Sequence, residues 1–278
     1  MSYLSRIDHA FSDAPVLPLS ENGRYVLFSD CHRGIGTSND NFLKNQHLYF
    51  AALNYYYQHS FCYIELGDGD ELWENRSFSS IQNIHSNVFW LLSLFYEEHR
   101  LFMLFGNHDI AKKDFHPFSD CCFHEGLRLK YCVTGQELYL THGHQADFFN
   151  STLWRLSCFL VRYLWKPLEQ FGVLDPTSAA KNYKVKNKTE QRLQEWTKLH
   201  KKILITGHTH RPVLGSKDSL YFNTGSCVHP RCITCIELVH RELSLVKWTL
   251  STKPDRTLFV AREVLAGPVG LDDLLKYS

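Results

Sequence analysis

The chain has 278 residues, of which 44% are hydrophobic, so it is long enough to fold as one domain with a sizeable core rather than stay disordered. Its 30 Lys and Arg nearly balance 29 Asp and Glu, and a formal net charge of +1 gives no global positive field of the kind expected of a dedicated nucleic-acid binder. Nine cysteines without a disulfide-like spacing, and an N-terminus without a signal-peptide pattern, favour the cytoplasm.

The first third of the chain alternates short apolar runs with longer amphipathic ones. Strands are expected at 25–29, 61–66 and 101–105, and helices at 41–59 and 78–100. This β-α-β-α-β order predicts a largely parallel sheet, whose functional residues gather at the carboxyl ends of the strands. The polar motifs SDCHRG, GDGDELW and GNHD occur at the ends of these three strands.

Shorter strands are expected in the rest of the chain, on both sides of a helical stretch. Residues 151–202 have a helical pattern, and they separate the motif THGH from the motif GHTH. The simplest architecture is a single α/β domain, residues 1–278, with two packed sheets, outer helices and a helical insertion at 151–202. The expected strands are 127–132, 137–141, 203–206, 221–224, 233–239, 243–250 and 258–264.

Two motifs contain pairs of metal-ligand residues. Asp30 and His32 form an Asp-x-His pair after the first expected strand, and His208 and His210 form a His-x-His pair after the strand at 203–206. Side chains two apart in an extended segment point to the same side, so each pair is expected to converge. One such pair is most often an ordinary surface loop. The ordered set at successive strand ends instead predicts a metal site.

Glycine precedes three of the candidate ligands. Asp68, Asn107 and His208 each follow a glycine, which lets the backbone turn sharply and approach closely. Carboxylate, carboxamide and imidazole groups together favour Mn, Fe or Zn over Ca, which prefers oxygen ligands only.

The motifs SDCHRG, GDGDELW, GNHD, THGH and GHTH, with NTGS at 223–226, resemble the blocks of the calcineurin-like metallophosphoesterase superfamily. The resemblance implies a four-layer αββα sandwich that binds two divalent or trivalent metal ions. It also implies hydrolysis of a phosphoester or pyrophosphate bond by a metal-bridging hydroxide. The implied ligands are Asp30, His32, Asp68 and His210 for one metal and Asp68, Asn107, His142 and His208 for the other, so that Asp68 bridges.

His108 and Glu71 are the candidate catalytic pair. The resemblance implies that His108, the third residue of GNHD, faces the leaving group as a general acid or charge stabiliser. Glu71, three residues after Asp68, matches the position of the carboxylate that orients this histidine in related phosphatases. Arg33 and His144 are expected to contact the substrate, Arg33 because its guanidinium matches phosphate oxygens.

Within the superfamily, GDGDELW and GHTHRP resemble the UDP-2,3-diacylglucosamine hydrolase branch, from which the chain departs at His108 and His144. The expected substrate is a phosphorylated small molecule, nucleotide conjugate or lipid, and its exact identity and the oligomeric state stay open. A nuclease or a protein phosphatase on the same scaffold is an alternative. A non-catalytic protein-binding scaffold is another, and it predicts lost ligands, of which the motifs show none.

The insertion is expected to lie over the metal site and to select the substrate. Its first part, 151–173, is rich in large apolar residues interspersed with Arg155, Arg162 and Lys166, and could contact an acyl chain or a membrane surface. An ordinary amphipathic lid packed on the body is the more common structure for such a composition. The basic residues of 181–202 could bind an anionic group or could form a solvated helix face.

Overall fold

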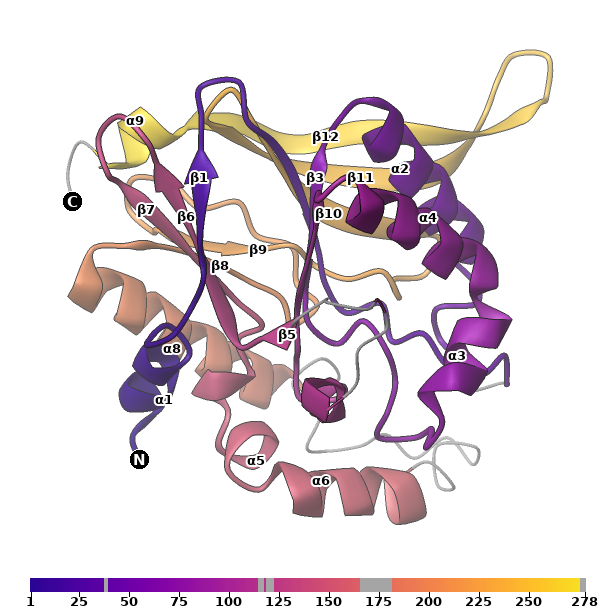
Figure 1. The fold of residues 1–278 in the computed structure, drawn as a ribbon, viewed down its shortest axis with the longest axis horizontal. Coiled ribbons are helices and arrows are strands. Elements are labelled where there is room, and N and C mark those ends of the chain that lie inside the picture. Colours follow the sequence, from indigo (N-terminus) through magenta and orange to yellow (C-terminus); the bar gives the residue numbers. More distant parts are fainter. Residues whose placement is uncertain (38–39, 115–117, 119–122, 166–181, 276–278) are drawn as a thin grey trace.

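The computed structural model describes residues 1–278 except 38–39, 115–117, 119–122, 166–181 and 276–278 (Figure 1). Two sheets pack face to face, and helices cover the outer side of each sheet. This arrangement confirms the expected αββα architecture. Among the described residues no helix is both long and apolar enough to cross a membrane.

The larger sheet has seven strands in the order β12-β11-β10-β2-β3-β4-β5. Its parallel part contains the strands expected at 25–29, 61–66 and 101–105. The parallel strands are β2 (Arg24–Phe28), β3 (Cys62–Leu66), β4 (Leu101–Leu104) and β5 (Phe123–His124). The antiparallel strands are β10 (Cys232–Val239), β11 (Glu242–Thr252) and β12 (Leu258–Gly270).

The smaller sheet has five strands in the order β1-β6-β7-β8-β9. Strands β7, β8 and β9 run parallel to one another, and β6 is antiparallel to β7. The edge strand β1 was not expected from the sequence, because it is short and contains Pro18, which a central strand would not tolerate. The bounds are β1 Val16–Leu19, β6 Gly126–Tyr131, β7 Glu137–Thr141, β8 Ile203–Thr206 and β9 Tyr221–Asn223.

Alternation along β2 separates two hydrophobic cores. Leu27 belongs to the core between the two sheets, whereas Val26 and Phe28 belong to the core beneath the helices on the larger sheet. These helices are α2 (Gln46–Gln58), α3 (Phe78–Ile84) and α4 (Ser86–Glu97). A third core lies on the outer side of the smaller sheet, under α1 (Tyr3–His9) and α8 (Tyr183–His200).

The expected insertion divides into two parts with different roles. Helix α8 packs on the smaller sheet through the buried Leu193 and Trp196, so it is part of the helical layer on that sheet. The first part lies at the end of the molecule opposite β12 (Figure 1). It contains α6 (Trp154–Leu160) and the π-helical turn η3 (Val161–Trp165), and it follows the short helices η2 (His144–Ala146) and α5 (Phe148–Ser151). Residues 166–181, with Lys166 and Lys181, lie outside the described residues.

Two short helices complete the fold. The 3-10 helix η1 (Ile110–Asp114) follows the GNHD motif, and α9 (Leu271–Leu275) follows β12. Leu271 and Leu274 of α9 are buried in the core between the sheets, which fixes the end of β12 to the body.

Candidate metal centre

The five motifs meet at the carboxyl ends of strands from both sheets. Asp30, Asp68 and Asn107 follow β2, β3 and β4, while His142 and His208 follow β7 and β8. Backbone hydrogen bonds join neighbouring loops within each sheet. The amide of Asp30 donates to the carbonyl of Gly67 at 3.1 Å, and that of Gly207 donates to the carbonyl of His142 at 3.0 Å.

Five predicted ligands have a left-handed backbone that non-glycine residues rarely adopt. The motif Asp30-x-His32 lies beyond the end of β2, so the strand alternation expected from the sequence does not position its side chains. The expected convergence is present, but the left-handed backbone produces it. Such conformations persist only where the surrounding structure holds them, and they cluster at functional sites. The residues and angles are Asp30 (φ 52°), His32 (48°), Asp68 (51°), His208 (67°) and His210 (55°).

Gly106 and Gly207 let the ligand loops approach so closely that a residue with a side chain would not fit at either position. A Cβ atom on Gly106 would lie 2.2 Å from Asp68 Oδ1, and one on Gly207 would lie 2.4 Å from Asp30 Oδ2. The expectation that glycine allows the ligand loops to approach closely is therefore confirmed at both positions.

The first group of donor atoms comes from Asp30, His32 and His210, whose ligand atoms lie within 4.8 Å of one another. The Nε2 atoms of His32 and His210 are 3.3 Å apart. Asp30 Oδ1 is 3.1 Å from His210 Nε2, and Asp68 Oδ2 is 3.9 Å from His32 Nε2. These are the side chains expected to hold the first metal.

The second group comes from Asp68, His142 and His208, again with ligand atoms within 4.8 Å of one another. Asp68 Oδ2 is 3.1 Å from His142 Nε2, so the same carboxylate borders both groups. Asn107 lies in the adjacent loop, where the amide of His108 donates to Asp68 Oδ1 at 2.8 Å. This set matches the residues expected to hold the second metal.

The unused hydrogen-bonding capacity of these side chains fits a pair of cations. Among the described residues, four buried atoms of the predicted ligands have no partner in hydrogen-bonding geometry: Asp30 Oδ1, Asn107 Oδ1, His142 Nε2 and His208 Nε2. Asp30 Oδ1 and His142 Nε2 each lie 3.1 Å from another predicted ligand, His210 and Asp68 respectively. A buried polar atom without a partner is costly, and a metal ion would satisfy each of them. Two outer ring nitrogens are fixed, because His142 Nδ1 donates to the carbonyl of Leu66 at 2.8 Å and His32 Nδ1 to Glu71 Oε2 at 2.9 Å. This leaves each Nε2 facing the centre, as metal-ligating histidines require.

The buried carboxylates of the site are stabilised by positive charge on the imidazoles beside them. Burial lowers the pKa of His32, but the hydrogen bond to Glu71 and the nearby carboxylates outweigh it and raise that pKa to about 10. Burial also opposes the charged form of His142, and the carboxylates still raise its pKa to about 9. Burial dominates at His210, where the pKa falls to about 4. Protons thus compensate the buried carboxylates, and a bound cation would replace them.

The expected catalytic pair is in contact. Glu71 Oε1 lies 2.8 Å from His108 Nδ1, and its other oxygen binds His32. Burial lowers the pKa of His108, but Glu71 and Asp68 raise it above its usual value. The His108 side chain is 21% exposed, more than those of His32 and His142, so its ring borders the open side of the site. Trp73, which the sequence did not single out, stacks on this ring with centroids 4.2 Å apart at 23°.

The expected phosphate contact by Arg33 is wrong. Its side chain is fully buried, and its guanidinium binds both oxygens of Asp70, at 2.7 and 3.2 Å, and also Glu65. A charge in the interior must be paired in this way, which leaves the guanidinium committed away from the substrate side. The charged Glu65 within an otherwise apolar strand run was the sequence signal for such a buried partner.

A buried lysine completes this network beneath the metal centre. Lys112 Nζ lies 2.8 Å from Asp109 and 3.5 Å from Glu65, so the carboxylate group of Glu65, Asp70 and Asp109 already holds a cation. Asp109 in turn accepts backbone N–H bonds from Asp68 at 3.1 Å and from Gly106 at 2.7 Å. It therefore fixes the loops that present the ligands.

His144 is 3% exposed and packs beside two predicted ligands. Its ring centroid is 5.5 Å from that of His142 and 6.5 Å from that of His208. Its contact with a substrate stays a prediction.

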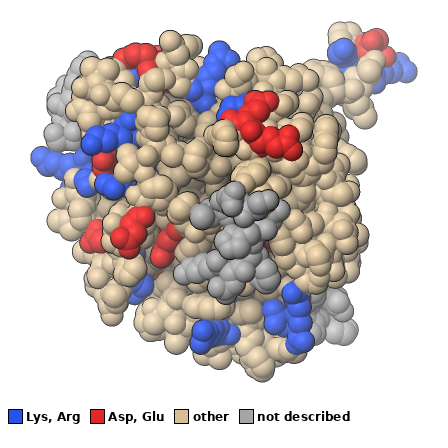
Figure 2. Space-filling model, viewed as in Figure 1, with Lys and Arg blue, Asp and Glu red and all other residues tan. Residues whose placement is uncertain are grey.

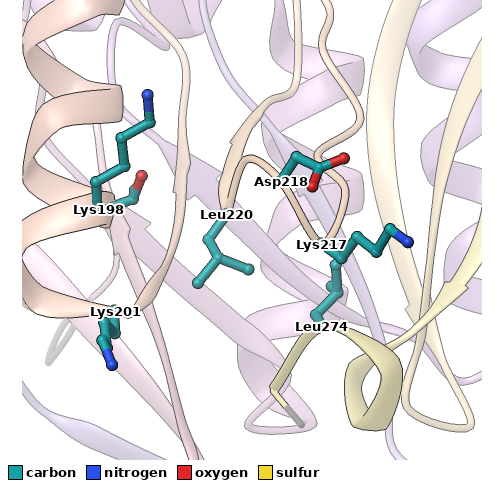
Figure 3. Close-up of a pocket in the computed structure, with 7 residues that line it drawn as sticks. Lys198, Lys201, Lys217, Asp218, Leu220 and Leu274 are labelled. Atoms are coloured by element: carbon teal, nitrogen blue, oxygen red, sulfur yellow. The ribbon is translucent and has the colours of Figure 1, made fainter. Parts of the chain in front are cut away.

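A separate hollow of about 120 Å³ lies between the end of α8, the loop before β9 and α9 (Figure 3). None of the residues that line it is a predicted ligand or catalytic residue. Lysines at the carboxyl end of α8 are favoured by the helix dipole, which accounts for two of them. The lining residues are Thr197, Lys198, Lys201, Lys217, Asp218, Leu220 and Leu274.

Comparisons with known proteins leave the expected superfamily and branch as predictions. No family model and no curated protein matches the chain. A solved structure that is similar in part is the crystal structure of Vps29 from Chaetomium thermophilum, with 11% identity and a TM-score of 0.41. The match covers 87% of this chain and 96% of that chain. The described residues form a two-sheet α/β fold with buried groups that could hold metal ions.

Proposed function

We propose that the chain is a dinuclear metal-dependent phosphoesterase that hydrolyses a phosphoester or pyrophosphate bond. The observation that carries the proposal is the pair of adjoining donor groups bordered by Asp68, together with buried ligand atoms that have no partner in hydrogen-bonding geometry among the described residues. These atoms are Asp30 Oδ1, Asn107 Oδ1, His142 Nε2 and His208 Nε2. Asp30, His32, Asp68 and His210 would hold one ion, and Asp68, Asn107, His142 and His208 the other. Mn, Fe and Zn suit this mixture of nitrogen and oxygen donors.

The chain's own residues supply orientation and a proton. When bound, the two ions would polarise the phosphoryl oxygens and lower the pKa of the attacking water. The bond from phosphorus to the leaving oxygen breaks as the water oxygen bonds to phosphorus. The proton on His108 Nε2 passes to the leaving oxygen, because Glu71 occupies Nδ1 and favours the imidazolium. The proton lost by the water goes to solvent.

The first part of the insertion supports a substrate with an apolar portion. Its helices carry a series of large, solvent-exposed apolar side chains next to the loop that carries Trp73, which η3 contacts directly. An exposed apolar surface of this kind suits an organic group, an acyl chain or a membrane surface. The exposed side chains are Leu156, Phe159, Tyr163 and Leu164, with Phe148 and Phe149 just before the insertion.

A polymeric nucleic-acid substrate is less well supported. On the face shown in Figure 2, Lys and Arg are interspersed with Asp and Glu rather than collected in one basic patch. The net charge of +1 agrees with this distribution.

A substrate panel with a metal-depleted control tests the function. The purified chain would be assayed with Mn²⁺ on phosphomonoesters, phosphodiesters, nucleotide sugars, cyclic nucleotides and a short single-stranded DNA. Hydrolysis of at least one small ester that requires metal and disappears in Asp68→Asn supports the proposal. Metal binding without hydrolysis of any substrate would contradict it and favour a non-catalytic scaffold, while hydrolysis of the DNA alone would favour the nuclease.

A further inference from the structure

The π-helical turn η3 is hydrogen-bonded to the loop that follows Glu71. Arg162 donates from Nε to the carbonyl of Trp73 at 2.7 Å and from Nη2 to the carbonyl of Leu72 at 2.9 Å. One guanidinium thus binds two consecutive carbonyls in a forked geometry. The next residue of η3, Tyr163, is hydrogen-bonded to Arg76 in the same loop. π-Helical turns occur frequently at functional sites.

The position of Trp73 depends on this backbone clamp. Its side chain is 3% exposed, and its Nε1 makes no hydrogen bond with any residue that the structure describes. Packing against its neighbours, which includes the stack on His108, and the placement of its own backbone therefore hold the indole. Because Arg162 binds the carbonyl of Trp73 itself, it sets where the indole meets the imidazole.

The same loop positions the catalytic pair from the other side. Glu71 binds His108 with one oxygen and His32 with the other, so the imidazole of His108 lies between Glu71 at its Nδ1 and Trp73 across its face. Glu71 contacts the edge of the His108 ring and Trp73 contacts its face, so together they fix the ring plane and the direction of the Nε2–H bond. Loss of either contact would let the ring tilt by more than general acid catalysis tolerates.

We infer that Arg162 is a positioning residue that acts through Trp73 to hold His108 in its proton-donating orientation. The inference rests on the proposed hydrolase function. It also gives the first part of the insertion a role besides substrate contact, because η3 lies within it. Displacement of η3 would weaken the proton donor without touching any predicted metal ligand.

Leaving-group dependence tests this role. Arg162→Met removes the clamp while keeping a long side chain, and Arg155→Met, an exposed position in α6, is the matched control. For an alkyl phosphate, whose leaving oxygen needs a proton, kcat of Arg162→Met should fall about tenfold to a hundredfold with little change in KM. For p-nitrophenyl phosphate, whose leaving group departs without protonation, kcat should stay within about twofold of the unmodified chain. Arg155→Met should match the unmodified chain on both esters.

A second readout is independent of activity. In the metal-free protein, the indole ring current should displace a ring-proton resonance of His108, assigned by its loss in His108→Gln. Arg162→Met should shift that resonance back toward its unstacked position, Arg162→Lys should produce a smaller shift in the same direction, and Arg155→Met should leave it unchanged. Should Arg162→Met not fold, the comparison of Arg162→Lys with Arg155→Met decides.

The outcomes separate the inference from the function on which it rests. An unmoved His108 resonance in the Arg162 variants, or an equal loss of rate on both esters, overturns the positioning role. A chain that hydrolyses neither ester nor any substrate of the panel contradicts the proposed function. The resonance then still shows whether Arg162 orients the ring.

Discussion

At the scale of single residues, the candidate centre depends on backbone conformations that the sequence does not reveal. Asp30, Asp68 and His208 have positive φ angles, each of which costs about 1–2 kcal/mol for a residue with a Cβ. Hydrogen bonds hold them there: the amide of His32 donates to the carbonyl of Asp68 at 2.9 Å, and that of His208 to Asp30 Oδ2 at 2.9 Å. The motifs predicted which side chains converge. They could not predict the left-handed turns, because those arise from contacts between distant loops.

Replacing Asp68 and replacing His108 should have different effects on metal content and on the rate of hydrolysis. Asp68→Ala removes the carboxylate that borders both donor groups, so metal content and activity should both be lost. His108→Ala should keep its metal and lose about 10² to 10⁴ in rate on an alkyl ester, the usual contribution of general acid catalysis. Elemental analysis and steady-state kinetics on both variants test this. Equal metal content and equal rates in the two would show that the roles are wrongly assigned.

Metal affinity should depend on pH through the buried imidazoles. In the metal-free protein the pKa is about 10 for His32 and about 9 for His142, so both carry protons at neutral pH that must leave before Nε2 can bind a cation. The apparent affinity for Mn²⁺ should therefore rise with pH, by about tenfold per unit for each proton displaced, from pH about 6 to about 9. Calorimetry in buffers of different ionisation enthalpy measures both the affinity and the protons released. An affinity independent of pH would contradict ligation by these two histidines.

Arg33 should matter for stability rather than for substrate binding. Removing one partner from a buried ion pair leaves the other charge uncompensated, which typically costs about 3–5 kcal/mol. Arg33→Met should therefore lower the free energy of unfolding by about that amount in urea, whereas Met at the exposed Arg256 should change it by less than about 0.5 kcal/mol. A stable Arg33→Met protein with a raised KM would restore Arg33 as a phosphate contact.

At the scale of elements, apolar runs in the sequence predict the buried strands well, whereas short or polar segments do not reveal the helices and strands that they form. The strand expected at 137–141 coincides with β7, and the one at 203–206 with β8, because both are mostly apolar and are buried in the sheet. Helix α1 and strand β1 were missed, since each is short and takes its stability from tertiary packing. The helix expected in the later part of the insertion is present as α8, and the lid role of 151–202 stays a prediction. The sequence of α8 is mostly charged and polar, so the few residues that pack on the sheet do not stand out in it.

The packing of α8 gives a prediction with its control on the same helix. Leu193 is fully buried on the smaller sheet, whereas Leu199 is 65% exposed. Leu193→Ala should lower the free energy of unfolding by about 2–5 kcal/mol through lost burial and the cavity left behind. Leu199→Ala should change it by less than about 0.5 kcal/mol. Equal effects in denaturant titrations would mean that α8 does not belong to the helical layer. The same packing implies that replacing all of 151–202 by a short linker would remove part of the core.

At the scale of the whole molecule, the two sheets place a buried candidate centre beside a less buried helical segment, and substrate choice should depend on that segment. Leu156 and Phe159 in α6 are 50% and 58% exposed, so replacing both by serine should cost little stability. If these side chains bind the apolar part of the substrate, the double variant should hydrolyse p-nitrophenyl phosphate at the normal rate. It should lose about tenfold in kcat/KM on an acylated phosphate ester, because two apolar side chains buried against the substrate contribute a few kcal/mol at most. Serine at the similarly exposed Val133 and Leu199, which lie outside the insertion, is the matched control and should leave both rates unchanged. Unaltered selectivity in the α6 variant would assign substrate choice to another surface, while an equal loss on both esters would place α6 in support of the centre itself.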